Sequence, residues 1–273
     1  MKKIVPIIIK IISILCIISI IYFSYKIITW KIHVDQNKKI KEEMKDKIKI
    51  IKPSSSSNIP EKAKYNIDLK SLREENKDAI GYIKVNNTNI DYIIVKGKDN
   101  SFYLNHNFKK EWNIAGWIFM DYRNKLDDNN IIIYGHDTKD GSMFGTLQNI
   151  LTKDWYSNKN NYEVIFVTEE DTYYYEVFSI YTIVPEDYYI TTSFNNENEY
   201  EKFLNTIKSR SIYNFNTDLK KEDKILTLSS CIGNYGEKRV VLHARRKEMS
   251  TEDNLEKKEE KNEKEWYNVY RKI

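Results

Sequence analysis

The sequence predicts a mostly β domain with a few flanking helices, folded as a closed or nearly closed barrel behind an N-terminal membrane-spanning helix. Many short runs rich in Ile, Val, Tyr and Thr are separated by turn residues, and few stretches show helical periodicity. Residues 1–30 are strongly apolar. The chain has 273 residues, enough for a large core, and an aromatic content of 13% excludes a wholly disordered protein.

The net charge of +4 is distributed unevenly along the chain. Residues 1–52 carry +8, all of their basic groups being lysines, and the remaining residues carry −4. A nucleic-acid-binding protein is expected to have a basic patch on its folded domain. The basic N-terminus therefore indicates membrane lipid as a partner, and nucleic acid is not an expected partner.

The N-terminal segment 1–30 is interpreted as an uncleaved anchor. Residues 11–25 are uncharged between Lys10 and Lys26, and extension to Ile4 or Trp30 reaches the length needed to span a bilayer. A cleaved signal peptide is the alternative, but no small-x-small cleavage site follows the apolar run. Lysines flank the span on both sides, so the positive-inside rule does not fix its orientation.

Residues 31–64 are expected to be a juxtamembrane helix and a linker. Ile40, Met44, Ile48 and Ile51 form one helical stripe, which would pack on the domain, on a second copy or on anionic lipid. The Pro- and Ser-rich residues 53–60 break this periodicity.

Residues 65–246 are expected to form the folded domain, and they contain the predicted strands and helices. The expected strands are 81–85, 90–95, 115–120, 131–134, 163–168, 173–181, 225–229 and 239–244. Helices are expected at 69–78, 143–151 and 197–209. The charged C-terminal extension, 247–273, alternates Lys and Glu, which favours a solvated helix, with docking of its aromatic end as the alternative.

Cys231 is the one cysteine of this body, because Cys16 lies inside the apolar span. It follows the strand 225–229 and precedes a glycine-containing loop, so a substrate could reach its thiol. The alternative is a buried cysteine acting as a small hydrophobic residue. The polar Ser229 and Ser230 before it argue for a reactive thiol.

Thiol chemistry also needs a group that transfers protons and a group that stabilises the oxyanion. Of the four histidines, His136 follows an apolar strand directly, so it sits at a strand exit as Cys231 does. Arg239 begins the strand eight residues after the cysteine, and an antiparallel return would bring its guanidinium beside Cys231. A strand-edge ion pair is the alternative for Arg239.

The motifs that contain these residues resemble the sortases, specifically class B. The resemblance is carried, in order, by Asp99–Leu104, by Gly116–Asp121, by Tyr134-Gly135-His136, by Thr227-Leu228-Ser229-Ser230-Cys231 and by Arg239-Val240-Val241. It covers about residues 65–246. Serine replaces the threonine that usually precedes the cysteine in this family, which keeps a hydroxyl group.

The resemblance implies an eight-stranded sortase-type β-barrel outside a Gram-positive cell, with one pass through the cell membrane. It implies a cysteine transpeptidase that cleaves an NPxTx-like sorting signal of surface proteins and transfers them to an amine of a peptidoglycan precursor. Cys231, His136 and Arg239 would be catalytic, and the implied substrate-binding residues are Ser229, Tyr134, Ser230 and Asn100.

Two other functions fit parts of the sequence. An L,D-transpeptidase also uses a cysteine on a β fold, but its His-Gly pair before the cysteine is missing here. A non-enzymatic anchored adhesin or assembly factor with an inert thiol is the second alternative. No metal or cofactor is expected, since the chain has no His-Glu-x-x-His, paired-cysteine or phosphate-loop motif.

Overall fold

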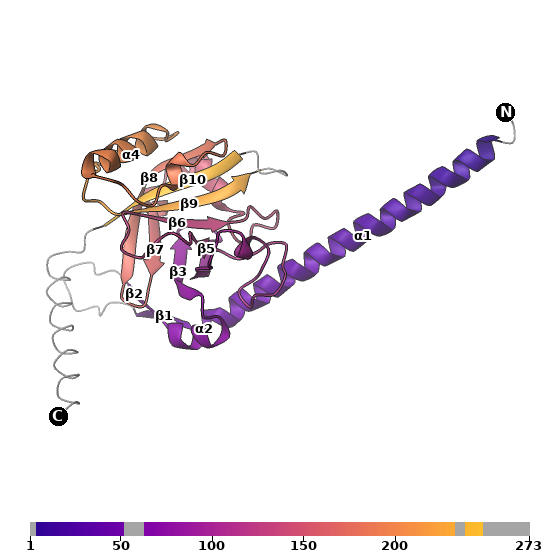
Figure 1. The fold of residues 1–273 in the computed structure, drawn as a ribbon, viewed down its shortest axis with the longest axis horizontal. Coiled ribbons are helices and arrows are strands. Elements are labelled where there is room, and N and C mark those ends of the chain that lie inside the picture. The colour runs from indigo at the N-terminus through magenta and orange to yellow at the C-terminus, as the bar shows by residue number, and fades with distance from the viewer. Residues whose placement is uncertain (1–3, 52–62, 233–237, 248–273) are drawn as a thin grey trace, which may run out of the picture.

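The computed structural model describes residues 4–51, 63–232 and 238–247. Its centre is a closed barrel of eight strands, which run around the barrel in the order β10-β8-β7-β3-β4-β5-β6-β9 (Figure 1). The predicted eight-stranded barrel is therefore confirmed. The strands are β3 (Ala79–Val85), β4 (Asp91–Val95), β5 (Phe119–Met120), β6 (Asn130–Gly135), β7 (Glu163–Val167), β8 (Thr172–Ile183), β9 (Ile225–Ile232) and β10 (Lys238–Arg246).

Two of the neighbouring strand pairs in the barrel are parallel, namely β4 with β5 and β6 with β9. The other neighbours are antiparallel. Because β6 and β9 run in the same direction, their carboxyl ends meet at one end of the barrel. That end therefore collects the residues that follow both strands.

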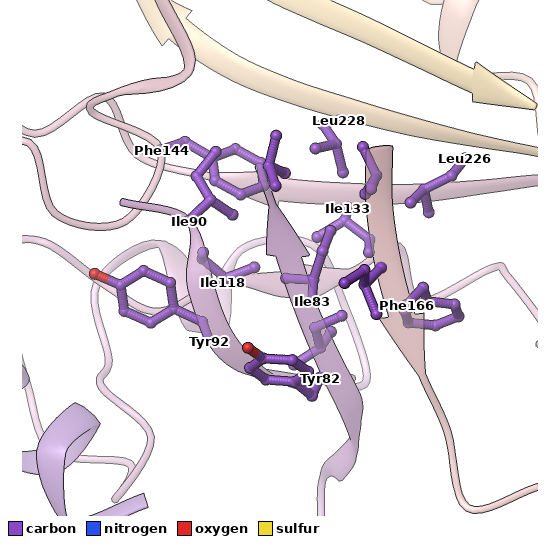
Figure 2. Close-up of a cluster of buried hydrophobic side chains, with 14 of the residues drawn as sticks. Tyr82, Ile83, Ile90, Tyr92, Ile118, Ile133, Phe144, Phe166, Leu226 and Leu228 are labelled. Atoms are coloured by element: carbon purple, nitrogen blue, oxygen red, sulfur yellow. The ribbon is translucent and has the colours of Figure 1, made fainter. Parts of the chain in front are cut away.

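The barrel interior is filled by large apolar side chains. Figure 2 shows Ile83, Ile133, Phe166 and Leu228 converging from four different strands, and each is at most 1% exposed. Complete burial of such a side chain contributes roughly 1.5–3 kcal/mol. The core thus fixes the register of the strands that carry the site.

The predicted anchor and the juxtamembrane segment form one helix, α1 (Ile4–Lys45). Within the described residues, α1 is the one helix that is long and apolar enough to cross a membrane. Ile40 and Met44 are 4% and 5% exposed and join the domain core. Of the three alternatives for this stripe, packing on the domain is the one observed.

The prediction that the helical stripe continues to Ile51 is wrong. Ile48–Ile51 forms strand β1, which pairs antiparallel with β2 (Lys64–Ile67). The isoleucines of β1 favour a strand once a partner strand is present. That partner follows the linker in the sequence, and β2 was not predicted.

The helices of the body agree in part with the predictions. α2 (Leu69–Glu75) begins at Asp68, whose carboxylate accepts the Ser71 amide, and it is shorter than predicted. α4 (Glu197–Ser209) matches its prediction and lies on the outside of the barrel beside β8 (Figure 1). The remaining short helices are η1 (Phe102–Leu104), η2 (Leu147–Leu151), α3 (Lys153–Tyr156), η3 (Lys159–Asn161) and η4 (Tyr188–Ile190).

Two predicted elements are shorter than expected for local backbone reasons. In the segment 115–120 only Phe119–Met120 is a strand, because Gly116 turns the chain at a φ of +57°. A Cβ at Gly116 would lie 2.3 Å from the carbonyl oxygen of Tyr103. In the segment 143–151, Met143 has a φ of +47°, so the helix begins only at Leu147. The linker 53–60, the loop 233–237 and the tail from 248 lie outside the described residues.

Candidate active site

Strands β9 and β10 bring Cys231 and Arg239 together. The antiparallel register pairs Arg239 with Cys231 and Val240 with Ser230. This is the adjacency expected from the eight-residue spacing in the sequence. For Cys231 the structure describes the strand backbone and not the side chain.

His136 lies at the same end of the barrel as this pair. The parallel register of β6 and β9 pairs Tyr134 with Ser229 and Gly135 with Ser230. His136 follows directly, as Cys231 follows Ser230. Residues separated by 95 positions in the sequence therefore leave neighbouring strands at the same level of the barrel.

The imidazole of His136 is oriented by a main-chain group. Its Nε2 lies 2.6 Å from the carbonyl oxygen of Leu104, at the end of η1. A carbonyl oxygen only accepts hydrogen bonds, so Nε2 carries a hydrogen in this arrangement. Nδ1 is then the ring nitrogen at which the neutral imidazole can accept a proton.

The loop after His136 folds back onto the strand end. The Phe144 amide donates to the His136 carbonyl at 2.9 Å. The backbones of Asp137 and Met143 form an isolated antiparallel β-bridge. Phe144 is fully buried, and its ring lies where a side chain at Gly135 would be, since a Cβ there would be 2.6 Å from the ring. Glycine at position 135 therefore lets the ring pack directly beneath the strand exit.

Asp121 organises a buried polar network next to the histidine strand. It is 0% exposed and accepts hydrogen bonds from Tyr134 Oη at 2.9 Å and from Asn100 Nδ2 at 2.9 Å. Arg123 binds the same carboxylate through Nε at 2.9 Å and through Nη2 at 2.7 Å. One carboxylate thus holds two of the residues implied as substrate-binding, Tyr134 and Asn100.

The pKa values in this network follow from its contacts. Burial raises the pKa of the Asp121 carboxyl, but the hydrogen bonds from Arg123, Tyr134 and Asn100 outweigh burial and leave the pKa below its usual value. Burial, together with the adjacent Asp121 charge, raises the pKa of Tyr134. Asp121 is therefore an acceptor and Tyr134 a donor at neutral pH.

The two serines before the cysteine have a different environment. Ser229 is 3% and Ser230 is 2% exposed, so both lie within the barrel wall. The hydroxyl of Ser229 lies 2.9 Å from the hydroxyl of Tyr189, in η4. Ser229 is therefore connected to η4 through Tyr189.

The other three histidines have different surroundings. His243 is fully buried between Tyr181 and Thr227, with hydrogen-bond distances of 2.8 Å to each hydroxyl. His33 contacts the Ile114 amide from α1, and His106 stacks on Phe102 in a loop. Among the described side chains, no group of three or more His, Cys, Asp or Glu is arranged to hold a metal ion.

Sequence reasoning did not identify Asp121, Arg123 or the Leu104 carbonyl as parts of the site. Asp121 follows β5 directly, which is the same strand-exit signal that selected His136. Two partners of its carboxylate, Asn100 and Tyr134, come from other segments, so their convergence depends on the closed barrel. A main-chain carbonyl such as that of Leu104 carries no signal of residue type.

This chain is similar to known proteins in its domain family, its sequence and its fold. The model of the sortase domain matches residues 83–247, more than half of the chain. Sortase B of Staphylococcus aureus is 34% identical over 239 residues, which cover 86% of this chain and 95% of that protein. Sortase B of Listeria monocytogenes is 40% identical over 175 residues, covering 60% and 67% of the two chains.

Solved structures give the same result for the fold. Sortase B of Bacillus anthracis, in complex with AAEK1, has a TM-score of 0.68 and 34% identity, covering 80% of this chain and 99% of that chain. Sortase B of Clostridium perfringens has a TM-score of 0.63 and 37% identity, covering 66% of this chain and all of that chain.

Proposed function

This chain belongs to the sortase family, in its class B, and we propose that it is a membrane-anchored enzyme that cleaves an NPxTx-like sorting signal through a thioacyl intermediate. Sortases of this class are cysteine transpeptidases that act in attaching surface proteins to the cell wall. Family membership decides against both alternatives, the L,D-transpeptidase and the non-enzymatic adhesin. One observation carries the proposal, the register that pairs Cys231 with Arg239 next to the strand that ends in His136.

The first half of the proposed reaction breaks a peptide bond. Cys231 reacts as a thiolate whose proton is held by His136, and its Sγ attacks the carbonyl carbon of the threonine in the sorting signal. The C–N bond to the next residue breaks, a thioester forms, and His136 donates a proton to the leaving amine. Arg239 binds the oxygen of the tetrahedral intermediate, where a guanidinium stabilises the developing negative charge.

The second half forms a new peptide bond. An amine of a peptidoglycan precursor attacks the thioester, the C–S bond breaks, and the thiolate of Cys231 leaves. His136 takes the proton from the attacking amine, so that the enzyme returns to its starting state. The hydrogen bond from Nε2 to Leu104 supports a role for Nδ1 in both transfers.

Four residues are proposed to contact the sorting peptide. Tyr134 and Asn100 lie side by side on Asp121, which supports a shared role in binding. Ser229 and Ser230 are proposed to contribute from β9, next to the cysteine, although their burial limits them to contacts at the base of the groove.

The apolar part of α1 is proposed to be the anchor that holds the catalytic domain on the outer face of the cell membrane. Its length and composition support this location. Lys2 and Lys3 would remain inside the cell, and Tyr22, Tyr25 and Trp30 would lie toward the outer interface.

The test is cleavage of a fluorogenic NPxTx-like peptide by the full-length protein in detergent. We expect Cys231→Ala to abolish cleavage and to remove labelling of the domain by a water-soluble thiol reagent. Cys16→Ala is the matched control, because it removes the other cysteine of the chain, and it should retain activity. Turnover by Cys231→Ala would overturn the proposal.

A further inference from the structure

We propose that the catalytic end of the barrel rests on the outer leaflet of the membrane, through a patch formed by Leu104, Trp112 and Ile114. We call these three residues the rim patch. The proposal rests on the anchor described under the proposed function and adds to it a second, independent contact between the domain and the lipid.

Hydrogen bonds fix α1 to the domain. Asn37 is 2% exposed, and its Nδ2 donates to Asn113 Oδ1 at 3.2 Å and to the Gly116 carbonyl at 3.1 Å. Asn113 in turn donates to the His33 carbonyl at 2.9 Å. One turn further along, Lys41 donates to the Asn89 carbonyl at 3.0 Å. The contacts of Asn37 and His33 hold the helix on the loop that carries Trp112 and Ile114, and Lys41 holds it on the turn between β3 and β4.

Helix α1 has no hinge between this attachment and the membrane. The helix is continuous from Ile4 to Lys45, and it contains no glycine and no proline after Pro6. Sharp kinks in helices occur mostly at such residues. Figure 1 shows α1 leaving the domain as one straight rod. The domain therefore stays at a fixed distance from the part of α1 that lies in the bilayer.

The length of the apolar part of α1 indicates its depth in the bilayer. A helix rises about 1.5 Å per residue, so the stretch from Ile4 to Trp30 is roughly 40 Å long. A bilayer with its headgroup layers is about 40–45 Å thick. Trp30 consequently lies in the outer interfacial layer, where tryptophan is enriched.

Part of the domain lies at the same depth as Trp30. Ile114 is next to His33, whose Nδ1 accepts the Ile114 amide at 3.3 Å. A hollow of about 480 Å³ separates α1 from the domain, lined on the helix side by Phe23, Ile27 and Trp30. Its other wall is formed by Ile114, Ala115 and the loop from His136 to Lys139. Domain residues and the last two turns of the proposed span thus enclose one space.

The chemistry of these surfaces fits lipid. Leu104, Trp112 and Ile114 are 40%, 61% and 54% exposed, so three large apolar side chains of neighbouring segments face outward beside the helix. Lys26 and Lys139 line the hollow and can meet anionic headgroups. On the membrane this apolar surface would no longer be in contact with water. Its burial stabilises the docked orientation.

One consequence concerns access to the site. His136 lines the hollow together with Trp30, so the catalytic end of the barrel opens at the level of the headgroups. A sorting signal would then approach the enzyme along the membrane surface.

The test uses the full-length protein in vesicles of equal parts phosphatidylcholine and phosphatidylglycerol, with and without bromine on the acyl chains. Bromine quenches tryptophan fluorescence on contact. In a Trp112→Phe background, Ile114→Trp is compared with Ile212→Trp. Ile212 is the matched control, because it is 56% exposed and directly follows the α4 region, away from α1.

We expect bromination to remove roughly half of the fluorescence that the tryptophan at position 114 adds, since interfacial tryptophans contact the upper acyl chains. The tryptophan at position 212 should lose almost none. Equal quenching at both positions, or none at 114, in protein that resists alkaline extraction from the vesicles would overturn the rim patch and leave the anchor intact. Protein that is extracted by alkali would overturn the anchor and with it this inference.

Discussion

The hydroxyl of Tyr134 donates a 2.9 Å hydrogen bond to the buried carboxylate of Asp121. Asn100 donates to the same carboxylate oxygen, so two residues from separate segments share one acceptor. Arg123 donates to both oxygens of this carboxylate and neutralises its charge. A charged acceptor roughly doubles the strength of such hydrogen bonds, which makes Asp121 a positioning residue for the proposed groove.

Asp121→Asn should weaken binding of the sorting peptide more than it slows the chemistry. The amide keeps the shape of the side chain but loses the charge that holds Tyr134, Asn100 and Arg123. We expect KM to rise about tenfold with a smaller change in kcat, since a hydrogen bond to a charged group contributes roughly 1.5–3 kcal/mol. Steady-state cleavage of the fluorogenic peptide measures both constants.

Asp128→Asn is the matched control for this variant. Asp128 accepts hydrogen bonds from Asn124 and Lys125 in the same loop but does not contact Tyr134 or Asn100. Its KM should remain near the wild-type value. An equal rise of KM in both variants would show that the loop fold matters and that the Asp121 carboxylate has no specific role.

Gly135→Ala should reduce both stability and activity, because the new methyl group would lie 2.6 Å from the Phe144 ring. Overpacking of this kind costs typically 1–3 kcal/mol, and here the displacement falls on the residue before His136. Phe144→Leu in the same chain makes room for the methyl group. Urea unfolding of the two single variants and the double variant should give a favourable coupling energy. Additive effects would contradict the packing argument.

Arg239→Lys should lower kcat about 10²- to 10³-fold with little change in KM, since removal of an oxyanion donor has an effect of this size. Lysine keeps the charge but not the planar fork of donors. Arg245 offers a matched control on the same strand, because its guanidinium contacts the Asp218 carbonyl and lies six residues from the site. Full activity of Arg239→Lys would mean that Arg239 has a structural role.

The sequence alone predicted the barrel, and it placed Cys231, Arg239 and His136 at strand ends, because signals for strands are local. Short β-branched runs predict strands, and residues that follow strands are placed at the barrel ends. The pairing of Arg239 with Cys231 follows from one hairpin. The proximity of His136 to Cys231 was indicated only by the order of the motifs, since a parallel partner strand 95 residues away has no local signal.

The missed features depend on contacts between distant segments. β1 exists because Lys64–Ile67 pairs with it across the linker. Asp121 acquires its role only when Asn100 and Tyr134 reach it from two other segments. The predicted strand 115–120 starts only at Phe119 because Gly116 closely approaches the Tyr103 carbonyl, and no residue pattern predicts this contact.

His243, on β10, should couple the uptake of a proton to unfolding. It is fully buried, and burial, aided by the charge of Arg210, lowers its pKa to about 3. Its nearest groups are the Tyr181 and Thr227 hydroxyls and the Phe178 ring, none of which is anionic. In the unfolded chain the imidazole takes up a proton near pH 6.5, whereas in the folded chain it stays neutral. Stability contributed by the neutral form is therefore present above pH 6.5 and falls as the pH decreases toward 3, by up to about 1.4 kcal/mol per pH unit. His243→Gln should flatten this slope in urea unfolding curves measured between pH 4 and pH 7, even if the variant is less stable at every pH. An unchanged slope would mean that His243 is not the group that links acid to unfolding.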